Sequence, residues 1–264
     1  MLDGIFCAID SSLGTLCPEF CAGIATTLKK NWSRFTVVDD GMTSALQELP
    51  LFPLNTVLFP YARLQIHVFE DRYRDLIRDC LQHDKKFGIA LIKNGAEVGD
   101  SAEPYLIGTT CRILTVQTYD DGRMDVLVQG EGRFRIRKVE SESPYLVGKV
   151  ENVAESSIED SPRCDAIILK TKEYLETFIE SYINRAEINV AKIKLPDDPA
   201  ALSFVVANFL QIENIQKQYL LETTDTLERL TEMLPILEDH VAQWASPSYS
   251  QLSVNDLMEW VSNN

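Results

Sequence analysis

The 264-residue chain contains no long apolar run, and this absence limits where the protein can reside. Its hydrophobic stretches fall far short of the roughly 20 residues that a helix needs to cross a bilayer. No basic segment followed by an apolar segment precedes a cleavage site, so a secretory signal is not indicated. We therefore predict a cytoplasmic protein that does not bind membranes.

Residues that bind metals or act as nucleophiles are also scarce. The six cysteines follow no regular framework, so reduced thiols are expected. Cys7, Cys17 and Cys21 lack a fourth zinc ligand nearby. The chain has three histidines and neither an H-E-x-x-H nor a Cys-x-x-Cys pattern. We predict no metal site and no cofactor.

The histidines have explanations that need no catalysis. His67 lies in a strand-to-helix stretch, where packing or hydrogen bonding accounts for it. His83 follows a predicted helix and can interact with its C-terminal carbonyls. His240 belongs to an acidic stretch that we expect to be solvated. The only other candidate acid–base group, formed by Glu70, Asp71 and Asp75, fits the charged face of a helix, so we assign no catalytic residue.

The charge balance opposes binding to nucleic acid. The net charge is −15, and residues 156–264 alone carry 8 basic and 18 acidic side chains. One local basic feature exists, the row Arg133, Arg135 and Arg137, with Arg112 and Arg123 on predicted neighbouring strands. Such a row more often pairs with acids across the sheet, such as Asp125, and no exposed aromatic platform accompanies it. We predict that nucleic acid is not a partner.

The proline-punctuated stretch from Leu49 to Tyr73 is the part around which the rest is organised. Its apolar pieces are too short for helices and suit strands, because proline within a sheet is found at strand starts, edges or bulges. We predict strands at Pro50–Phe52, Thr56–Phe59 and Leu64–Phe69. A helix over Asp71–Gln82 should follow, and its inward face should hold Tyr73, Leu76, Ile77, Cys80 and Leu81.

Further strands are expected up to residue 153. They are Phe87–Ile92, Ile107–Thr118, Met124–Gln129, Arg133–Val139 and Tyr145–Val153. A hairpin turn at Asp120-Asp121-Gly122 suits the positive φ of such turns, and Gly130 and Gly132 mark a bend. Many short strands and one early helix indicate a closed or nearly closed small barrel.

The pattern then changes to helical spacing. Ser161 can cap a long helix, and Asp198-Pro199 repeats this start signal. A short helical piece at Ile212–Leu221 precedes a last helix capped by Asp225, whose apolar side should hold Leu227, Leu230, Leu234, Leu237 and Val241. Strands followed by helices predict an α+β fold.

Several motifs resemble the N-terminal substrate-binding domain of the ATP-dependent Lon protease family. They are Leu49-Pro50-Leu51-Phe52-Pro53-Leu54, Val57-Leu58-Phe59-Pro60, His67-Val68-Phe69-Glu70, Gly108–Ile113, Gly130–Ile136, Asp198–Leu202 and Lys217–Leu230. Gln65 and Asp71 stand where the resemblance leads us to expect proline. The resemblance covers about residues 48–243 and implies a PUA-like β-barrel followed by a helical bundle.

The resemblance implies recognition of unfolded or hydrophobic polypeptide segments. Full Lon proteases follow this domain with ATPase and Ser–Lys protease modules. Here the one Gly-Lys pair, Gly148-Lys149, is followed by Val150 and is too far from Gly132, so no P-loop is present. We therefore expect a non-enzymatic, stand-alone Lon-type domain that acts as an adaptor or regulator of protein quality control, with a protease or chaperone as a further partner.

We divide the chain into an extension of residues 1–45, a barrel lobe 46–155, a helical lobe 156–245 and a tail 246–264. Met42 is an alternative start. The expected site is an apolar groove between the lobes or an exposed sheet edge. Two alternatives stay open: a small-molecule enzyme with a pocket at His67 or the arginine row, and an RNA-binding barrel.

Overall fold

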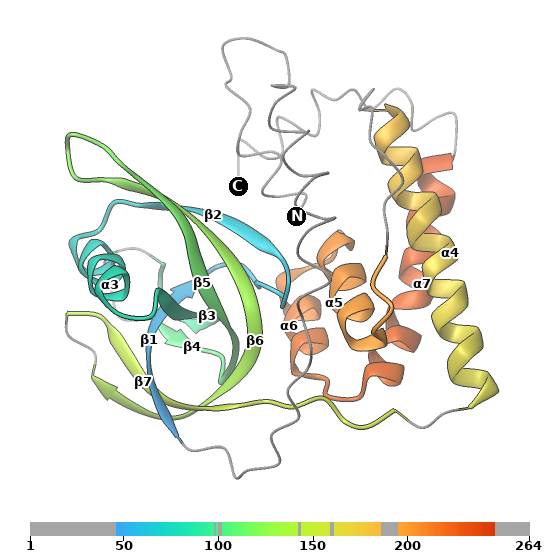
Figure 1. The fold of residues 1–264 in the computed structure, drawn as a ribbon, viewed down its shortest axis with the longest axis horizontal. Coiled ribbons are helices and arrows are strands. Elements are labelled where there is room, and N and C mark those ends of the chain that lie inside the picture. Colours follow the sequence, from blue (N-terminus) through green and yellow to red (C-terminus); the bar gives the residue numbers. More distant parts are fainter. Residues whose placement is uncertain are drawn as a thin grey trace.

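A computed structural model describes residues 46–97, 99, 102–141, 144–158, 161–185 and 195–245 (Figure 1). Within these ranges, seven strands and five helices form a mixed α/β fold in which most strands precede most helices. The strands are β1 Gln47–Leu54, β2 Arg63–Val68, β3 Lys86–Asn94, β4 Glu103–Pro104, β5 Ile107–Thr118, β6 Met124–Ser141 and β7 Leu146–Asn152. The helices are α3 Asp71–Gln82, α4 Pro162–Arg185, α5 Pro199–Phe209, α6 Asn214–Glu222 and α7 Thr226–Ala245. The predicted extension 1–45 and tail 246–264 lie outside the described residues.

Five of the strands are joined by a closed circuit of pairings. The order β1–β7–β6–β5–β3 is antiparallel throughout, and β3 then pairs with β1 in parallel. β4 pairs with β3, and β2 pairs with β6. Among the described strands, β2 and β4 therefore lie outside the circuit, each with one neighbour.

The hairpin between β5 and β6 confirms the predicted turn. Gly122 has a φ of 84°, which favours glycine, and the Tyr119 N–H bonds to the Arg123 carbonyl across the turn. The expected bend at Gly130–Gly132 is a β-bulge instead of a break. Thr110 pairs with Gly132 and Cys111 with Gly130, so Glu131 is the extra residue and β6 continues through it.

The predicted strand Thr56–Phe59 is wrong. This segment is irregular, although Val57, Leu58 and Phe59 are buried. Its backbone is satisfied in another way, because the Thr109 hydroxyl donates to the Leu58 carbonyl at 2.5 Å. Burial of an irregular segment therefore explains this apolar run. A short apolar run of this kind looks the same in the sequence as a buried strand.

The helix starts follow the predicted capping signals. The Ser161 hydroxyl accepts the Cys164 N–H, the Asp198 carboxylate accepts the Ala201 N–H, and the Asp225 carboxylate accepts two N–H groups of the first turn of α7. Two face assignments need correction. Leu81 on α3 is 39% exposed, and Met233 of α7 is buried whereas Leu227 and Leu234 are only partly so.

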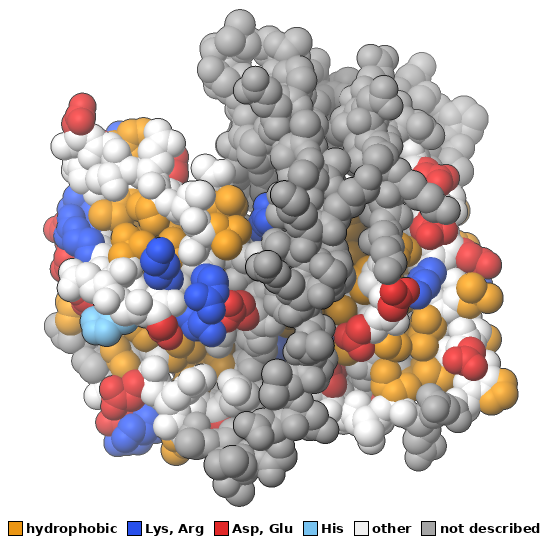
Figure 2. All heavy atoms as spheres, viewed as in Figure 1, with side chains coloured by type: hydrophobic (Ala, Val, Ile, Leu, Met, Phe, Trp, Pro, Cys, Tyr) orange, Lys and Arg blue, Asp and Glu red, His pale blue; other side chains and the backbone are white. Residues whose placement is uncertain are grey.

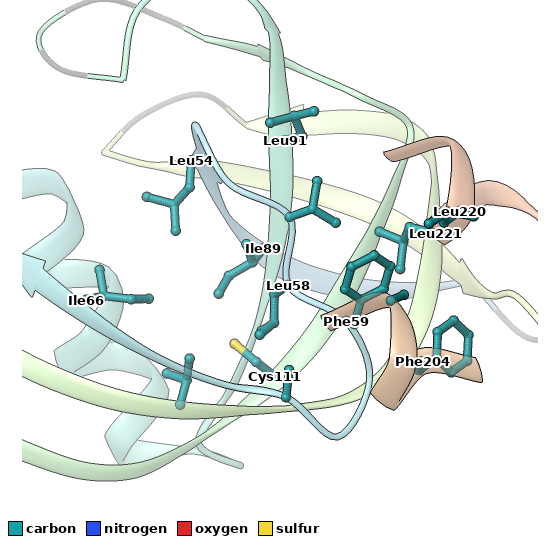
Figure 3. Packing of buried hydrophobic residues seen from close by; sticks show 14 of the residues in the cluster. Leu54, Leu58, Phe59, Ile66, Ile89, Leu91, Cys111, Phe204, Leu220 and Leu221 are labelled. Carbon is teal, nitrogen blue, oxygen red and sulfur yellow. The ribbon is translucent and has the colours of Figure 1, made fainter. Parts of the chain in front are cut away.

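One apolar cluster joins the strands to the helices. Phe59 from the β1–β2 connection packs against Phe204 of α5, with ring centroids 6.4 Å apart, and Leu220 and Leu221 of α6 belong to the same cluster (Figure 3). In Figure 1 the helices α4 to α7 stand beside the strand-rich half, while α3 packs within it. The two halves are therefore held together by a shared core.

Candidate functional site

A groove of about 350 Å³ opens between β2 and the end of β1. It is lined by residues of β1, β2, the start of α3 and two connections, namely Phe52, Leu54, Thr56, Leu64, Gln65, Ile66, His67, Val68, Phe69, Glu70, Tyr73 and Glu97. Figure 3 shows two of them, Leu54 at the end of β1 and Ile66 on β2. The groove lies within the strand-rich half; the sequence predicted either an apolar groove between the lobes or an exposed sheet edge.

The floor of the groove is apolar. Phe52, Leu54 and Val68 are buried, and the rings of Phe52 and Tyr73 stack with centroids 3.9 Å apart. Phe69 stands at the rim with 47% of its surface exposed. Figure 2 shows that hydrophobic side chains also reach the surface of the strand-rich half in patches among charged ones. A pocket of this volume and character suits apolar side chains.

One backbone edge of β2 faces this groove. Among the described strands, β2 pairs only with β6, in a regular antiparallel register without shifts. The Gly130 N–H donates to the Ala62 carbonyl just before β2, which fixes the alternation of the ladder. Every second residue counted from Ala62 therefore bonds to β6. Gln65 and His67 lie between these residues, so their N–H and C=O groups point to the opposite, open edge.

His67 stands at the rim and is held by a carboxylate. Its Nδ1 lies 2.6 Å from Asp125 Oδ1, and the Tyr119 hydroxyl donates to Asp125 Oδ2 at 2.5 Å. Burial alone would raise the pKa of Asp125, but these two bonds outweigh it and the pKa is lowered. The bond to Asp125 raises the pKa of Tyr119. The predicted role of His67 in hydrogen bonding is thus visible, with Asp125 as partner.

The acidic residues near the groove do not converge as an acid–base cluster. Glu70 pairs with Arg72 at 3.1 Å, whereas Asp71 and Asp75 pair with arginines one turn further along α3. Glu97, on the β3–β4 connection, also lines the groove and forms no ion pair with any residue that the structure describes. Sequence reasoning missed Glu97 and the groove itself, because no local pattern marks either.

The predicted arginine row is divided between the surface and the interior. Arg137 pairs with Glu151 on the neighbouring strand at 2.5 Å, which confirms the predicted pairing of this row with acids across the sheet. Arg112 and Lys86 share Glu131, at 2.5 and 2.7 Å. Burial would raise the pKa of Glu131, but the bonds to its two basic partners outweigh burial and lower it. Arg123 pairs with Asp121, and Asp125, which we expected to pair with this row, bonds to His67 and Tyr119 instead.

Arg133, which we expected to share one strand face with Arg135 and Arg137, is buried between the two halves. It donates to the carbonyls of Leu221 and Thr223 at 2.7 and 2.8 Å, and to Glu155 at 2.5 Å. Burial lowers the pKa of Arg133 to about 10, still far above neutral, so the guanidinium stays charged. Its side chain is only 1% exposed.

Arg229 of α7 completes this buried polar centre. Its guanidinium lies 2.7 Å from the second oxygen of Glu155 and donates to the Ser203 hydroxyl at 2.9 Å. The guanidinium carbons of Arg133 and Arg229 lie 5.4 and 4.1 Å from the ring centroid of Phe204. Two cations therefore share one carboxylate and one aromatic ring, an arrangement that joins β6, the β7–α4 connection and α7.

The remaining predicted groups lie away from the groove. His83 Nδ1 contacts the Asp79 carbonyl at 2.7 Å in the last turn of α3, as predicted, and His240 Nδ1 contacts the Ile236 carbonyl at 2.8 Å. His240 is part-buried instead of fully solvated. Cys7, Cys17 and Cys21 lie outside the described residues. No three metal-ligating side chains come together in the described part of the chain. None of its helices is both long and apolar enough to span a bilayer.

Comparison with solved structures places this fold among Lon N-terminal domains. The Lon N-terminal domain protein from Xanthomonas campestris is 29% identical, with a TM-score of 0.55 over 72% of this chain and 98% of that one. The N-terminal domain of the Mycobacterium avium complex Lon protease superposes with a TM-score of 0.54 over 74% of this chain and all of that one, at 24% identity.

Sequence comparison identifies the family. The family described as ATP-dependent protease La (LON) substrate-binding domain matches residues 48–239, and the chain belongs to it. The Lon protease of Flavobacterium johnsoniae is 32% identical over 189 residues, which is 70% of this chain and 23% of that protein. Lon protease 2 of Bdellovibrio bacteriovorus is 27% identical over 225 residues, 83% of this chain and 28% of that protein. The chain thus spans about a quarter of the length of these relatives.

Proposed function

We propose that this protein binds unfolded or hydrophobic polypeptide segments in the groove beside β2 and catalyses no reaction on them. The observation that carries the proposal is an apolar groove bordered by an open strand edge, in a chain of the LON substrate-binding family. Apolar side chains can enter the groove, and an exposed edge can bind an extended backbone.

The proposal gives the protein a role in recognition alone. The ATPase and protease activities of full-length Lon proteins are not attributed to this chain. Binding without cleavage fits an adaptor or regulator of protein quality control that passes segments to a protease or chaperone, and we place it in the cytoplasm.

The two halves of the chain have distinct architectures. We infer that the closed circuit of strands in residues 46–155 is the PUA-like barrel, and that α4 to α7 in residues 156–245 are the helical bundle lobe. The circuit of pairings and the separate packing of α4 on α7 support this division.

The two alternative functions have less support. His67 does line the groove, as a small-molecule enzyme would require, but its neighbours there are mostly apolar, and its imidazole is bound to Asp125 at the surface. An RNA site would need the arginine row as a basic face, whereas Arg133 is buried and Arg137 is paired with Glu151. A phosphate backbone would also meet a net charge of −15.

The test is binding of the full chain to a fluorescently labelled, permanently unfolded polypeptide, compared with the native form of the same polypeptide. We expect micromolar binding of the unfolded form only. Phe69→Ser at the groove rim should weaken this binding several-fold. Leu169→Ser on α4, where the leucine is 60% exposed, is the matched control and should leave it unchanged. Absence of binding by a folded protein, or equal effects of the two substitutions, would refute the proposal.

A further inference from the structure

We infer that the groove binds its segment as an added β-strand along β2, and that it prefers a segment with a basic residue beside alternating apolar ones. This inference rests on the proposed function and specifies the ligand of that site. It follows from three features of the structure: the direction of the free backbone groups of β2, the position of the apolar floor, and the charge of the lining.

The free backbone groups provide the pairing. Gln65 and His67 each direct one N–H and one C=O to the edge that no described strand occupies. These residues are two apart, so their groups repeat at about 6.6 Å, which is the two-residue spacing of an added strand. Both residues line the groove, so the open edge and the cavity form one surface.

The apolar floor selects the side chains. In an added strand, alternate side chains point to the same side. Those on one side would enter the cavity formed by Phe52, Leu54 and Tyr73, and those on the other would face water. The ligand is therefore an extended segment in which apolar and polar residues alternate, and not an amphipathic helix, whose backbone groups are already paired.

The charge of the lining selects a cation. Among the described residues that line the groove, Glu70 and Glu97 are the carboxylates, and neither Lys nor Arg is present. Glu70 is neutralised by Arg72, whereas Glu97 has no ion-pair partner in the described part of the chain. A Lys or Arg next to the apolar residues of the ligand would pair with Glu97, and the charge of −15 on the whole chain acts in the same direction.

Gln65 offers a clean perturbation of the edge. Its N–H does not take part in the ladder with β6, so Gln65→Pro removes one free donor without removing a strand bond, and proline is tolerated on such edges. Gln65→Val is the matched control, because it changes the side chain and keeps the N–H. Thermal unfolding of both variants should be close to that of the unaltered protein.

The probe is a nine-residue fluorescein-labelled peptide in which Phe or Leu alternates with Thr and Lys stands at each end. Binding to the full chain is measured by fluorescence anisotropy. Two further peptides are N-methylated, one on its Phe and Leu residues and the other on its Thr residues. Strand addition predicts that one of these two patterns weakens binding at least about tenfold and the other has little effect, because only alternate N–H groups face β2. Gln65→Pro should weaken binding about 3- to 10-fold, and Gln65→Val should not.

A version of the peptide with Glu at each end tests the charge. We expect it to bind about threefold more weakly at low salt, with the difference lost at high salt. Glu97→Lys should abolish this preference, whereas Glu232→Lys, which makes the same change on the exposed side of α7, should not. Equal effects of the two N-methylation patterns, with unfolded polypeptide still bound, would overturn strand addition and leave the proposed function intact. If neither the peptides nor the unfolded polypeptide binds, both fail.

Discussion

Removal of the charge on Glu155 should destabilise the protein strongly. Among the residues that the structure describes, this carboxylate is the one anion that contacts both Arg133 and Arg229, whose side chains are 1% and 0% exposed. Glu155→Gln keeps the shape of the side chain but leaves two buried guanidinium groups without a counter-charge. Breaking a buried ion pair in this way costs about 3–5 kcal/mol. Since Glu155 itself is 25% exposed, we expect a value near the lower limit, about 3 kcal/mol.

The measurement is urea unfolding followed by circular dichroism, with thermal unfolding as a second observable. A loss of about 3 kcal/mol corresponds to a fall in Tm of roughly 6–12 °C for a chain of this size. Glu151→Gln is the control, because Glu151 also accepts an arginine at 2.5 Å, but Arg137 is 48% exposed. An exposed pair contributes at most about 1 kcal/mol. If the two substitutions cost the same, the view of Glu155 as the counter-ion of a buried centre is wrong.

Three further outcomes are expected. Gly130→Ala should lower the free energy of unfolding, measured in urea, by about 1–3 kcal/mol, because a Cβ there would lie 2.4 Å from a backbone carbonyl oxygen. Gly132→Ala, with open space around it, should cost little. An equal loss for both substitutions would contradict this prediction. Glu131→Gln should lower the free energy of unfolding by about 1 kcal/mol at pH 7. Because the pKa of Glu131 is lowered in the folded state, the difference from the unaltered protein should shrink as the pH falls below about 4.5. A difference that stays constant with pH would refute this prediction. Burial raises the pKa of Cys80 to about 12, and it also raises the pKa of Cys111 well above its ordinary value. Peptide mapping after iodoacetamide treatment at pH 8 should therefore find both unmodified in the native protein and alkylated in denaturant.

Much of the fold could be predicted because its signals are local. The strand Ile107–Thr118 and the helix Asp71–Gln82 have the predicted bounds, and the turn at Gly122 depends on a backbone conformation that glycine adopts readily. The caps at Ser161 and Asp198 are single hydrogen bonds between near neighbours in the chain. Such features are determined within a few residues, so the sequence carries them directly.

The errors arise where distant segments decide the outcome. Arg133 alternates as predicted on its strand, but helices from the far end of the chain cover the face on which it lies. The Leu221 carbonyl of α6 and the Thr223 carbonyl just after this helix accept its N–H groups. The apolar side chain of Phe59 packs against Phe204 of α5, although Phe59 does not belong to a strand. The groove likewise depends on how β1, β2 and α3 converge, and Glu97 enters it from a connection with no pattern of its own.

The open edge of β2 also bears on how copies of the protein behave toward one another. A strand with one unpaired edge is a template for any other strand, including the same strand of a second molecule, and proteins commonly protect such edges by keeping them short and charged. β2 is only six residues long, and each approaching copy brings a net charge of −15. Mutual repulsion should therefore oppose pairing between identical molecules at neutral pH, whereas it does not oppose the approach of neutral or basic segments. Near the sequence isoelectric point of about 4.6 this repulsion should vanish, and we expect edge-to-edge self-association to compete with ligand binding there.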